Sequence, residues 1–423
     1  MTESLEERQH GVKQGSPDLA SAETALEGLE QVTTLSPAEV RRSFRLDVVA
    51  ASFYSVFGLA IVTFPAVLAR KDGASDLVVS LVIAAPAIAQ LSTVFWSRFT
   101  QNMPKMKVML GIGYAARLSL MLTLIAFNPL IFALVILLAN TLEFAKMPAY
   151  ASIMNQIYPD NRRGELMGKV RVVYSVVMVI SAALLGAALE QYSYQVVYPV
   201  VALLGVISNV IFGFIRYRDE PATRTPTPLR KLLLIPRTDR RYGLFLWTIF
   251  LMGFFNLLAS AVFPIVMVDE LKVSNGFLGL VSAVQSFVSI LAYFVWGKLS
   301  DRRHPAEILF LTFVFNCLIV FVYLIAWSSW LLILVAILTG ISLAGADLAT
   351  INVAIRFART KEDIPHYLGL YSSLVGVRGI IAPFLAALML NFTGTRAVLL
   401  VAFIGITISS LNFVRVRRVL SLG

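Results

Sequence analysis

The chain has 423 residues, of which 58% are hydrophobic and 14% charged, with a formal net charge of +11, one cysteine and three histidines. Soluble domains have about 45–50% apolar and about 25% charged residues, so this composition excludes an ordinary soluble protein and indicates a chain surrounded mostly by lipid. The cations lie in short clusters between apolar segments and not on one face, which argues against nucleic acid as a partner. The single cysteine excludes a disulfide framework, and we expect neither a metal site nor a cofactor.

Residues 1–40 carry eight acids, two bases and no aromatic residue, a composition typical of a disordered tail. The tail has no apolar segment, so we do not interpret it as a cleaved signal peptide. Its end, Ser36-Pro37-Ala38-Glu39, has the N-cap serine, first-turn proline and returning carboxylate of a capping box. The sequence therefore predicts that a helix starts here and leads into the first membrane span.

Twelve segments are apolar for long enough to cross about 30 Å of hydrocarbon as helices. We predict spans at residues 46–69, 76–96, 107–127, 129–156, 168–190, 195–215, 242–267, 276–297, 306–326, 329–355, 366–391 and 395–414. The regions outside the spans divide sharply by charge. One side has 27 cations, counting both ends of the chain, and the other has four, which are Arg70, Lys71, Lys272 and Arg396. The positive-inside rule therefore predicts that both termini are cytoplasmic.

Short sequence matches recur at a displacement of 199 to 201 residues. Phe64-Pro65 matches Phe263-Pro264, Trp96 matches Trp296, and Leu166-Met167-Gly168 matches Tyr367-Leu368-Gly369. A duplicated apolar chain is a common design of membrane carriers. We therefore predict two six-helix bundles, an N-terminal one at 41–215 and a C-terminal one at 242–423 that ends in a short basic tail. The acidic tail at 1–40 precedes them, and a basic cytoplasmic linker at 216–241 joins them. That linker either is a solvated tether or forms a short helix on the inner leaflet.

The connection after the eighth span reads Gly297-Lys298-Leu299-Ser300-Asp301-Arg302-Arg303. With twelve spans, a 6+6 repeat and a long central loop, this segment resembles the signature loop of the major facilitator superfamily. The resemblance covers the chain from about residue 41 to its end. It implies an all-α membrane fold of two pseudo-symmetric bundles and a cytoplasmic gate formed by Gly297, Asp301 and Arg302. In that family the glycine allows close helix approach. The matching loop of the first half, Ser97 to Asn102, lacks the glycine, the acid and the paired arginine.

Ionisable residues within apolar runs are the strongest candidates for function, because each costs at least about 2.5–3.5 kcal/mol at mid-bilayer unless it faces protein or water. Five residues qualify: Arg117, Glu143, Lys146, Asp347 and Arg378. Counting residues along the helices places all but Lys146 within a turn or two of the membrane midplane. Substrate and ion sites of repeat-built carriers lie at that depth.

Glu143 and Lys146 lie three residues apart on the fourth span, with Asn140 one turn earlier, so they share one helix face. Asp347 holds a comparable position on the tenth span. The resemblance implies that both spans line the central cavity, where a desolvated carboxylate can carry a proton. We expect Glu143 or Asp347 to couple transport to protons. The alternative is static pairing, of Glu143 with Lys146 or Arg117 and of Asp347 with Arg378.

The other candidates have weaker signals. Arg117 lies on the third span, which the family places at the periphery, so structural pairing is its better interpretation. Arg378 lies between two glycines and before Pro383, where it either holds an anionic substrate group or neutralises Asp347. Asn256 on the seventh span, beside an aromatic pair, either lines the cavity or packs between helices.

These observations predict a secondary active transporter that moves a small charged, zwitterionic or amphiphilic molecule by alternating access, coupled to protons. Its environment is membrane lipid, and we expect a monomer. The predicted location is the plasma membrane, or the inner membrane if the source is a Gram-negative bacterium. An uncoupled facilitator of the same fold and a non-transporting receptor stay open as alternatives. No Walker loop and no catalytic constellation occurs in the sequence, which disfavours an ATP-driven pump and an enzyme.

Overall fold

The computed structural model describes residues 36–100, 102–159, 162–217, 239–300, 303–357 and 364–421. These residues form helices and loops without any strand. Twelve helical segments within them are long and apolar enough to cross a membrane, as the sequence predicts. The acidic tail up to residue 35 and linker residues 218–238 lie outside the described residues.

The helices of the first half are α2 (Pro37–Val62), α3 (Pro65–Lys71), α4 (Asp76–Phe99), α5 (Lys105–Ser119), η1 (Leu120–Ile125), α6 (Pro129–Ala145), α7 (Met147–Ile157), α8 (Arg163–Gln191) and α9 (Tyr194–Gly213). The helices of the second half are α11 (Arg240–Ile265), η2 (Val266–Glu270), α12 (Asn275–Ser300), α13 (Pro305–Ile325), α14 (Leu331–Ile355), α15 (Ile364–Leu390) and α16 (Thr395–Ser421).

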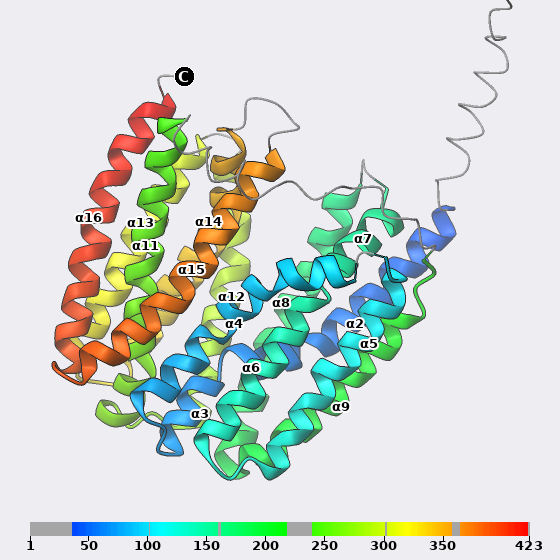
Figure 1. The fold of residues 1–423 in the computed structure, drawn as a ribbon, viewed down its shortest axis with the longest axis horizontal. Coiled ribbons are helices and arrows are strands. Elements are labelled where there is room, and N and C mark those ends of the chain that lie inside the picture. The colour runs from blue at the N-terminus through cyan, green and yellow to red at the C-terminus, as the bar shows by residue number, and fades with distance from the viewer. Residues whose placement is uncertain are drawn as a thin grey trace, which may run out of the picture.

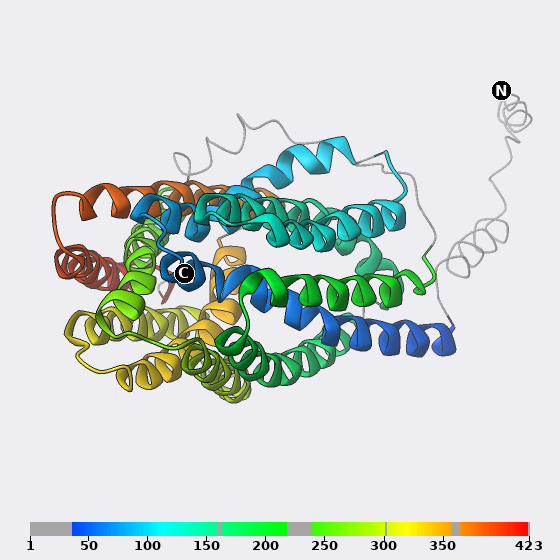
Figure 2. The ribbon, with the colours of Figure 1, turned by 90° about the horizontal axis from the view of Figure 1, so that it is seen from below.

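The two halves form separate bundles that lie side by side (Figure 1). Within the first bundle, α2 packs against α8 and α9, and α4 packs against α6. Within the second bundle, α11 packs against α15 and α16, and α14 packs against α12 and α13. The most extensive contacts between the bundles are those of α4 with α15 and of α8 with α12, which run along opposite edges of the molecule (Figure 2), and α3 and α4 also contact α11 or η2.

Glycines bring these helix pairs into close contact. A Cβ atom added to Gly186 of α8 would lie 2.6 Å from the Cα of Gly279 in α12. A Cβ atom added to Gly376 of α15 would lie 2.5 Å from the Cγ of Leu91 in α4. Small residues at such crossings allow van der Waals packing, which drives helix association where lipid provides no hydrophobic force.

Local sequence signals explain several helix starts. The predicted capping box is confirmed, because the Glu39 backbone N–H donates to Ser36 Oγ and the Glu39 carboxylate accepts from the Ser36 backbone N–H at 3.0 Å. The first span therefore begins at Pro37, nine residues before the predicted position. It also ends earlier, at Val62, since Pro65 starts the separate helix α3.

The fourth span differs from the prediction of one continuous helix. It is divided into α6 and α7, with Lys146 at the junction and Pro148 in the first turn of α7. Proline has no backbone N–H, so Pro148 cannot continue the helical hydrogen bonds to the carbonyl of Phe144. The corresponding tenth span, α14, is one unbroken helix. The first half thus has a helix break where the second half has none.

Candidate functional site

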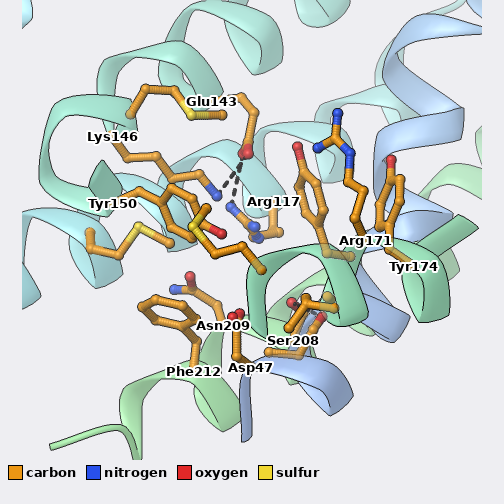
Figure 3. Close-up of a pocket in the computed structure, with 17 residues that line it drawn as sticks. Asp47, Arg117, Glu143, Lys146, Tyr150, Arg171, Tyr174, Ser208, Asn209 and Phe212 are labelled. Carbon is orange, nitrogen blue, oxygen red and sulfur yellow. Dashed lines mark hydrogen bonds and ion pairs between the residues drawn. The ribbon is translucent and has the colours of Figure 1, made fainter. Parts of the chain in front are cut away.

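A cavity of about 280 Å³ lies inside the first bundle (Figure 3). Its lining comes from α2, α5, α6, α7, α8 and α9, and it includes Arg117, Glu143 and Lys146 among the residues singled out by sequence. The other polar or aromatic lining residues are Asp47, Tyr54, Tyr150, Arg171, Tyr174, Ser208, Asn209 and Phe212. The cavity lies towards the end of the bundle where α2 begins and α9 ends.

Three buried charges form one cluster beside this cavity. The Glu143 carboxylate lies 3.0 Å from Nη1 of Arg117 and 2.7 Å from Nζ of Lys146. The side chains of all three residues are at most 5% exposed. The structure therefore pairs Glu143 with both cations. In a medium of low dielectric such a carboxylate is held in its charged form by its two neighbours.

Arg117 is fixed by backbone groups as well as by Glu143. Its Nε donates to the carbonyl of Gly205 at 3.2 Å, and its Nη1 also donates to the carbonyl of Gly113 at 3.0 Å. A Cβ atom on Gly205 would lie 2.6 Å from Arg117 Cγ, so only glycine leaves room for this arginine. The guanidinium also lies over the ring of Phe57 at 5.0 Å. Arg117 thus joins α5 to α9, α6 and α2.

Lys146 has fewer partners. Its ammonium contacts Glu143 and lies 5.1 Å from the ring centroid of Tyr54. An ammonium has three donors and a guanidinium has five. Glu143 takes one Lys146 donor, and Nη2 of Arg117 has no hydrogen-bond partner among the described residues. Both cations therefore present unused N–H donors next to the cavity that they line.

Asp47, on α2, lines the cavity on the side away from the cluster of Arg117, Glu143 and Lys146 (Figure 3). Its carboxylate accepts a hydrogen bond of 2.7 Å from the hydroxyl of Tyr158, which follows α7. Burial raises the pKa of the Tyr158 phenol, and the negative charge of Asp47 raises it further, so Tyr158 stays a donor across the physiological range. This bond ties α2 to the end of the broken fourth span.

Asn140 lies away from the cavity lining and joins two helices. Its Nδ2 donates to the carbonyl of Ile61 in α2 at 3.2 Å and to that of Ile136 in α6 at 2.9 Å. The side chain is buried, and its Oδ1 has no hydrogen-bond partner among the described residues. These contacts give Asn140 a structural role in this conformation.

Asp347 and Arg378 lie in the second bundle with separate partners. Asp347 is exposed and accepts a hydrogen bond of 2.6 Å from the hydroxyl of Tyr293 in α12. Arg378 donates from Nη1 to the carbonyl of Ile249 and packs against Gly253, where any side chain would collide with the guanidinium. Within the described part of the chain these two residues form no ion pair with each other.

Asn256 belongs to a neutral polar network in the second bundle. It donates to Oδ1 of Asn316 at 2.6 Å, and Asn316 donates to Oγ of Ser342 and to the carbonyl of Thr312, both at 2.8 Å. These bonds join α11, α13 and α14, so Asn256 acts between helices in this structure.

The signature loop is only partly described. Asp301 and Arg302 lie outside the described residues. Gly297 lies near the end of α12, and no described atom comes within 4 Å of the position where its Cβ would be. The close helix approach implied by the resemblance is therefore not seen at Gly297 in this conformation.

Polar contacts join the two halves at the opposite end of the molecule, around α3 and η2. We call Arg70, Asp76 and Asp269 the interhalf cluster: Arg70 donates to Asp76 at 2.9 Å and from Nε to Asp269 at 3.0 and 3.1 Å. The hydrogen bonds that Arg70 donates to Asp269 raise the pKa of the Arg70 guanidinium. Beside this cluster, Lys71 donates to the side chain of Asn275 at 2.8 Å, and Glu190 accepts from the backbone of Gly276 at 3.0 Å.

Sequence reasoning missed several lining residues. Asp47 is the second residue of the first span predicted from the sequence, and an acid at that position is expected to lie at the membrane interface. Arg171 and Tyr174 lie on α8, and Asn209 donates to the carbonyl of Leu110 from α9. The fifth and sixth predicted spans contain none of the ionisable residues that were selected as candidates within apolar runs. Only the packing of six helices around one space brings these residues together.

Comparisons with known proteins agree with this architecture. The sequence profile of the Major Facilitator Superfamily matches residues 46–260 and, separately, residues 244–421. No curated protein matches the chain. Among solved structures, a single-site mutant of the nucleoside transporter NupG is similar with a TM-score of 0.72 and 11% sequence identity, over 89% of this chain and 99% of that one. Another NupG structure has a TM-score of 0.66 and 12% identity, over 89% and 98%. At such identity the likeness concerns the fold.

Proposed function

Because the chain belongs to the Major Facilitator Superfamily and is therefore a multi-pass membrane transporter, we propose that it is a secondary transporter that works by alternating access. In such a mechanism two bundles rock about a substrate site, which opens to one side of the membrane at a time. The transported molecule is a small solute, and the driving ion is the proton.

The contact between the two halves in the interhalf cluster is the observation that supports this proposal. Arg70 and Asp269 belong to different bundles, and their contact closes the end of the molecule around α3 and η2. The cavity lies towards the opposite end, where α2 begins and α9 ends. Closure at one end together with a lined cavity towards the other is expected for one end state of an alternating-access cycle. The excess of cations at that other end supports the proposal that it and both termini lie on the cytoplasmic side of the plasma or inner membrane.

Asp347 is the better proton carrier of the two acids. The Glu143 carboxylate forms ion pairs with two buried cations in this structure, so its protonation would leave both cations without a counter-charge. The Asp347 carboxylate is exposed and has a neutral hydroxyl as its partner, so no ion pair is broken when it takes up a proton. We therefore assign proton coupling to Asp347 and a structural or substrate-binding role to Glu143.

Uptake of labelled solutes by purified protein in liposomes tests the proposal, because uptake is detected whether or not it moves net charge. Solutes of several classes are supplied with and without an inward proton gradient: carboxylates, amino acids, sugars, and nucleosides because the similar solved structures are nucleoside transporters. We expect the gradient to increase the uptake of at least one class. Asp347→Asn should lose the gradient-driven uptake and keep solute exchange, because exchange needs no net proton movement. Glu165→Gln removes an exposed acid on α8 and is the matched control.

The results separate the rival functions. A flux that ignores the proton gradient in wild type and in Asp347→Asn favours an uncoupled facilitator. Binding of a solute without any uptake of it contradicts transport and favours a receptor. Deleting residues 1–35 tests the receptor further, since a carrier keeps its flux without the acidic tail whereas a receptor that signals through that tail loses its output.

A further inference from the structure

The cavity in the first bundle has unused hydrogen-bond donors on nearly fully buried cations. Arg117 and Lys146 both line it, and each side chain is at most 5% exposed. After their bonds to Glu143 and to backbone carbonyls, Nη2 of Arg117 and two donors of Lys146 have no partner within the described residues. Donors on buried cations are costly to leave without an acceptor. Water or a ligand that enters the cavity can supply acceptors to these donors.

The charges of the cluster point to the sign and size of that molecule. Two cations share one carboxylate, Glu143, so the cluster has one unit of positive charge in excess. Asp47 lies seven residues before Tyr54, about 10 Å along α2, so its negative charge is separated from the cluster that contacts Tyr54. Arg171, the remaining charged lining residue, is exposed and adds positive charge. A ligand with a single negative charge near Arg117 and Lys146 would neutralise the cluster.

The rest of the lining describes the body of such a ligand. Met109, Met147 and Met167 supply polarisable apolar surface, and Tyr54 and Tyr174 supply aromatic rings. The cavity volume of about 280 Å³ is at the lower end of the range for small-molecule sites, about 300–1,000 Å³. Asp47 at the far end of the lining would repel a second acid group.

We propose that this cavity binds a small organic monocarboxylate, whose two oxygens accept hydrogen bonds from Nη2 of Arg117 and Nζ of Lys146 while its apolar body lies against the methionines and tyrosines. The proposal rests on the proposed transport function, because it names the substrate class of the carrier. The binding site can nevertheless be tested apart from transport.

Thermal stability of the detergent-purified full chain provides the test, because a ligand that binds only the folded state raises the midpoint temperature. The probes are propanoate, benzoate, benzamide and terephthalate. Benzamide keeps the shape of benzoate without its charge, and terephthalate adds a second carboxylate. We expect a saturable shift with at least one monocarboxylate, none with benzamide and a weaker one with terephthalate.

Lys146→Met is the decisive variant, since it removes one donor group and leaves Arg117 and Glu143 as a neutral pair. We expect it to stay folded and to bind the monocarboxylate at least about tenfold more weakly, the loss expected for a charged hydrogen bond. Lys298→Met changes an exposed lysine of α12 outside the cavity and is the matched control, which should bind as wild type does.

Each outcome supports the site or overturns it. No shift with either monocarboxylate, equal shifts with benzoate and benzamide, or unchanged binding by Lys146→Met each overturns the proposal. A terephthalate shift as large as that of benzoate overturns the assignment of a single negative charge. If other solutes are taken up while monocarboxylates are neither taken up nor inhibitory, this site alone is overturned, whereas monocarboxylate binding without uptake of any labelled solute overturns the transport function and leaves the site.

Discussion

Each half of the molecule buries a polar network at corresponding positions, but the two networks differ in charge. At a displacement of 199 residues, which relates Phe64 to Phe263, Asn256 corresponds to Phe57 and Asn316 to Arg117. The second bundle joins its helices there with amides and hydroxyls, through Asn256, Asn316 and Ser342. The first bundle uses Arg117 with its buried carboxylate and lysine.

The comparison distinguishes the polar contacts that the fold requires from the buried charges that occur in the first bundle. At displacements of 199 to 201 residues, the second half has Asn316, Cys317 or Leu318 at the position of Arg117 and Ser342, Leu343 or Ala344 at that of Glu143. All of these are neutral, and that half still forms a six-helix bundle. Neutral side chains therefore suffice to join these helices. Replacing buried ion pairs by neutral groups is often neutral or stabilising, so stability alone does not explain the charges. We infer that the charges of the first bundle serve ligand binding.

The largest loss of stability is expected for Glu143→Gln. This substitution leaves Arg117 and Lys146 buried without a counter-charge, and breaking such a cluster costs about 3–5 kcal/mol. Chemical or thermal denaturation of the purified protein, compared with wild type, measures the loss. A variant as stable as wild type would mean that water or lipid headgroups already solvate the cluster, and the contrast between the halves would disappear.

A smaller loss is expected for Asn316→Leu in the second half. The change removes the acceptor of Asn256 and two donor bonds, to Ser342 and to the carbonyl of Thr312. Each neutral group left buried without a partner costs about 1–3 kcal/mol, and Leu recovers part of this by packing. The same denaturation measurement should therefore place this variant between wild type and Glu143→Gln. If it were the least stable, charge would not be what distinguishes the two networks.

Lys146→Met should change stability by less than about 1 kcal/mol, because a one-to-one pair of Arg117 and Glu143 remains and a buried ammonium is removed. The opposite responses of two residues in one ion pair would sharpen the comparison, since Glu143 would be required for folding and Lys146 would not. Denaturation of the double variant Glu143→Gln with Lys146→Met provides the check. It should recover part of the stability lost by Glu143→Gln alone, and no recovery would argue against the excess positive charge.

The smallest expected effect is a pH dependence of stability at the start of α13, which corresponds to the start of α5 in the first half. Pro104 caps α5 without a side-chain hydrogen bond, whereas His304 Nδ1 accepts from the backbone N–H of Ala306 at 3.2 Å. Burial, aided by the charge of Arg356, lowers the pKa of His304 from its ordinary value of 6.5. The folded state thus favours the neutral imidazole, and its contribution is present above pH 6.5 and lost as pH falls through the lowered value.

We expect this cap to contribute less than about 1 kcal/mol at pH 7.5, and less at pH 5 than at pH 7.5. Stability curves at both pH values for wild type and His304→Asn measure it. Asparagine caps a helix at either pH, so the variant should lose this part of the pH dependence. An unchanged dependence would assign it to other groups.

Much of the fold was predictable because lipid imposes strict rules on sequence. Runs of about 20 apolar residues specify the twelve helices, and the recurrence of Phe64-Pro65 at Phe263-Pro264 specifies the repeat. The break at Lys146 was not predicted, although Pro148 is its cause. Proline occurs inside other helices of the structure without dividing them, as Pro86 does in α4. Its effect depends on whether the surrounding helices satisfy the freed backbone groups.

The site was predictable only in part. Charged residues in apolar runs were easy to find, and Glu143, Lys146 and Arg117 do meet around one cavity. The proposed pair of Asp347 and Arg378 does not form in the described part of the chain, because each finds a partner on a different neighbouring helix. Helix periodicity gives the face of a residue but not the rotation of its helix against the others. That rotation decides which of several possible partners a buried charge meets.

The interhalf cluster carries a trace of how the molecule arose. Arg70 and Asp269 are 199 residues apart, so they occupy the same position in the two copies of the repeat, as do Lys71 and Glu270. Equivalent positions of two copies related by a twofold axis meet at that axis. Two identical copies would therefore have set arginine against arginine, or acid against acid. In a fused chain the two copies can diverge in charge. Here that divergence replaced a repulsive contact with an ion pair between the halves.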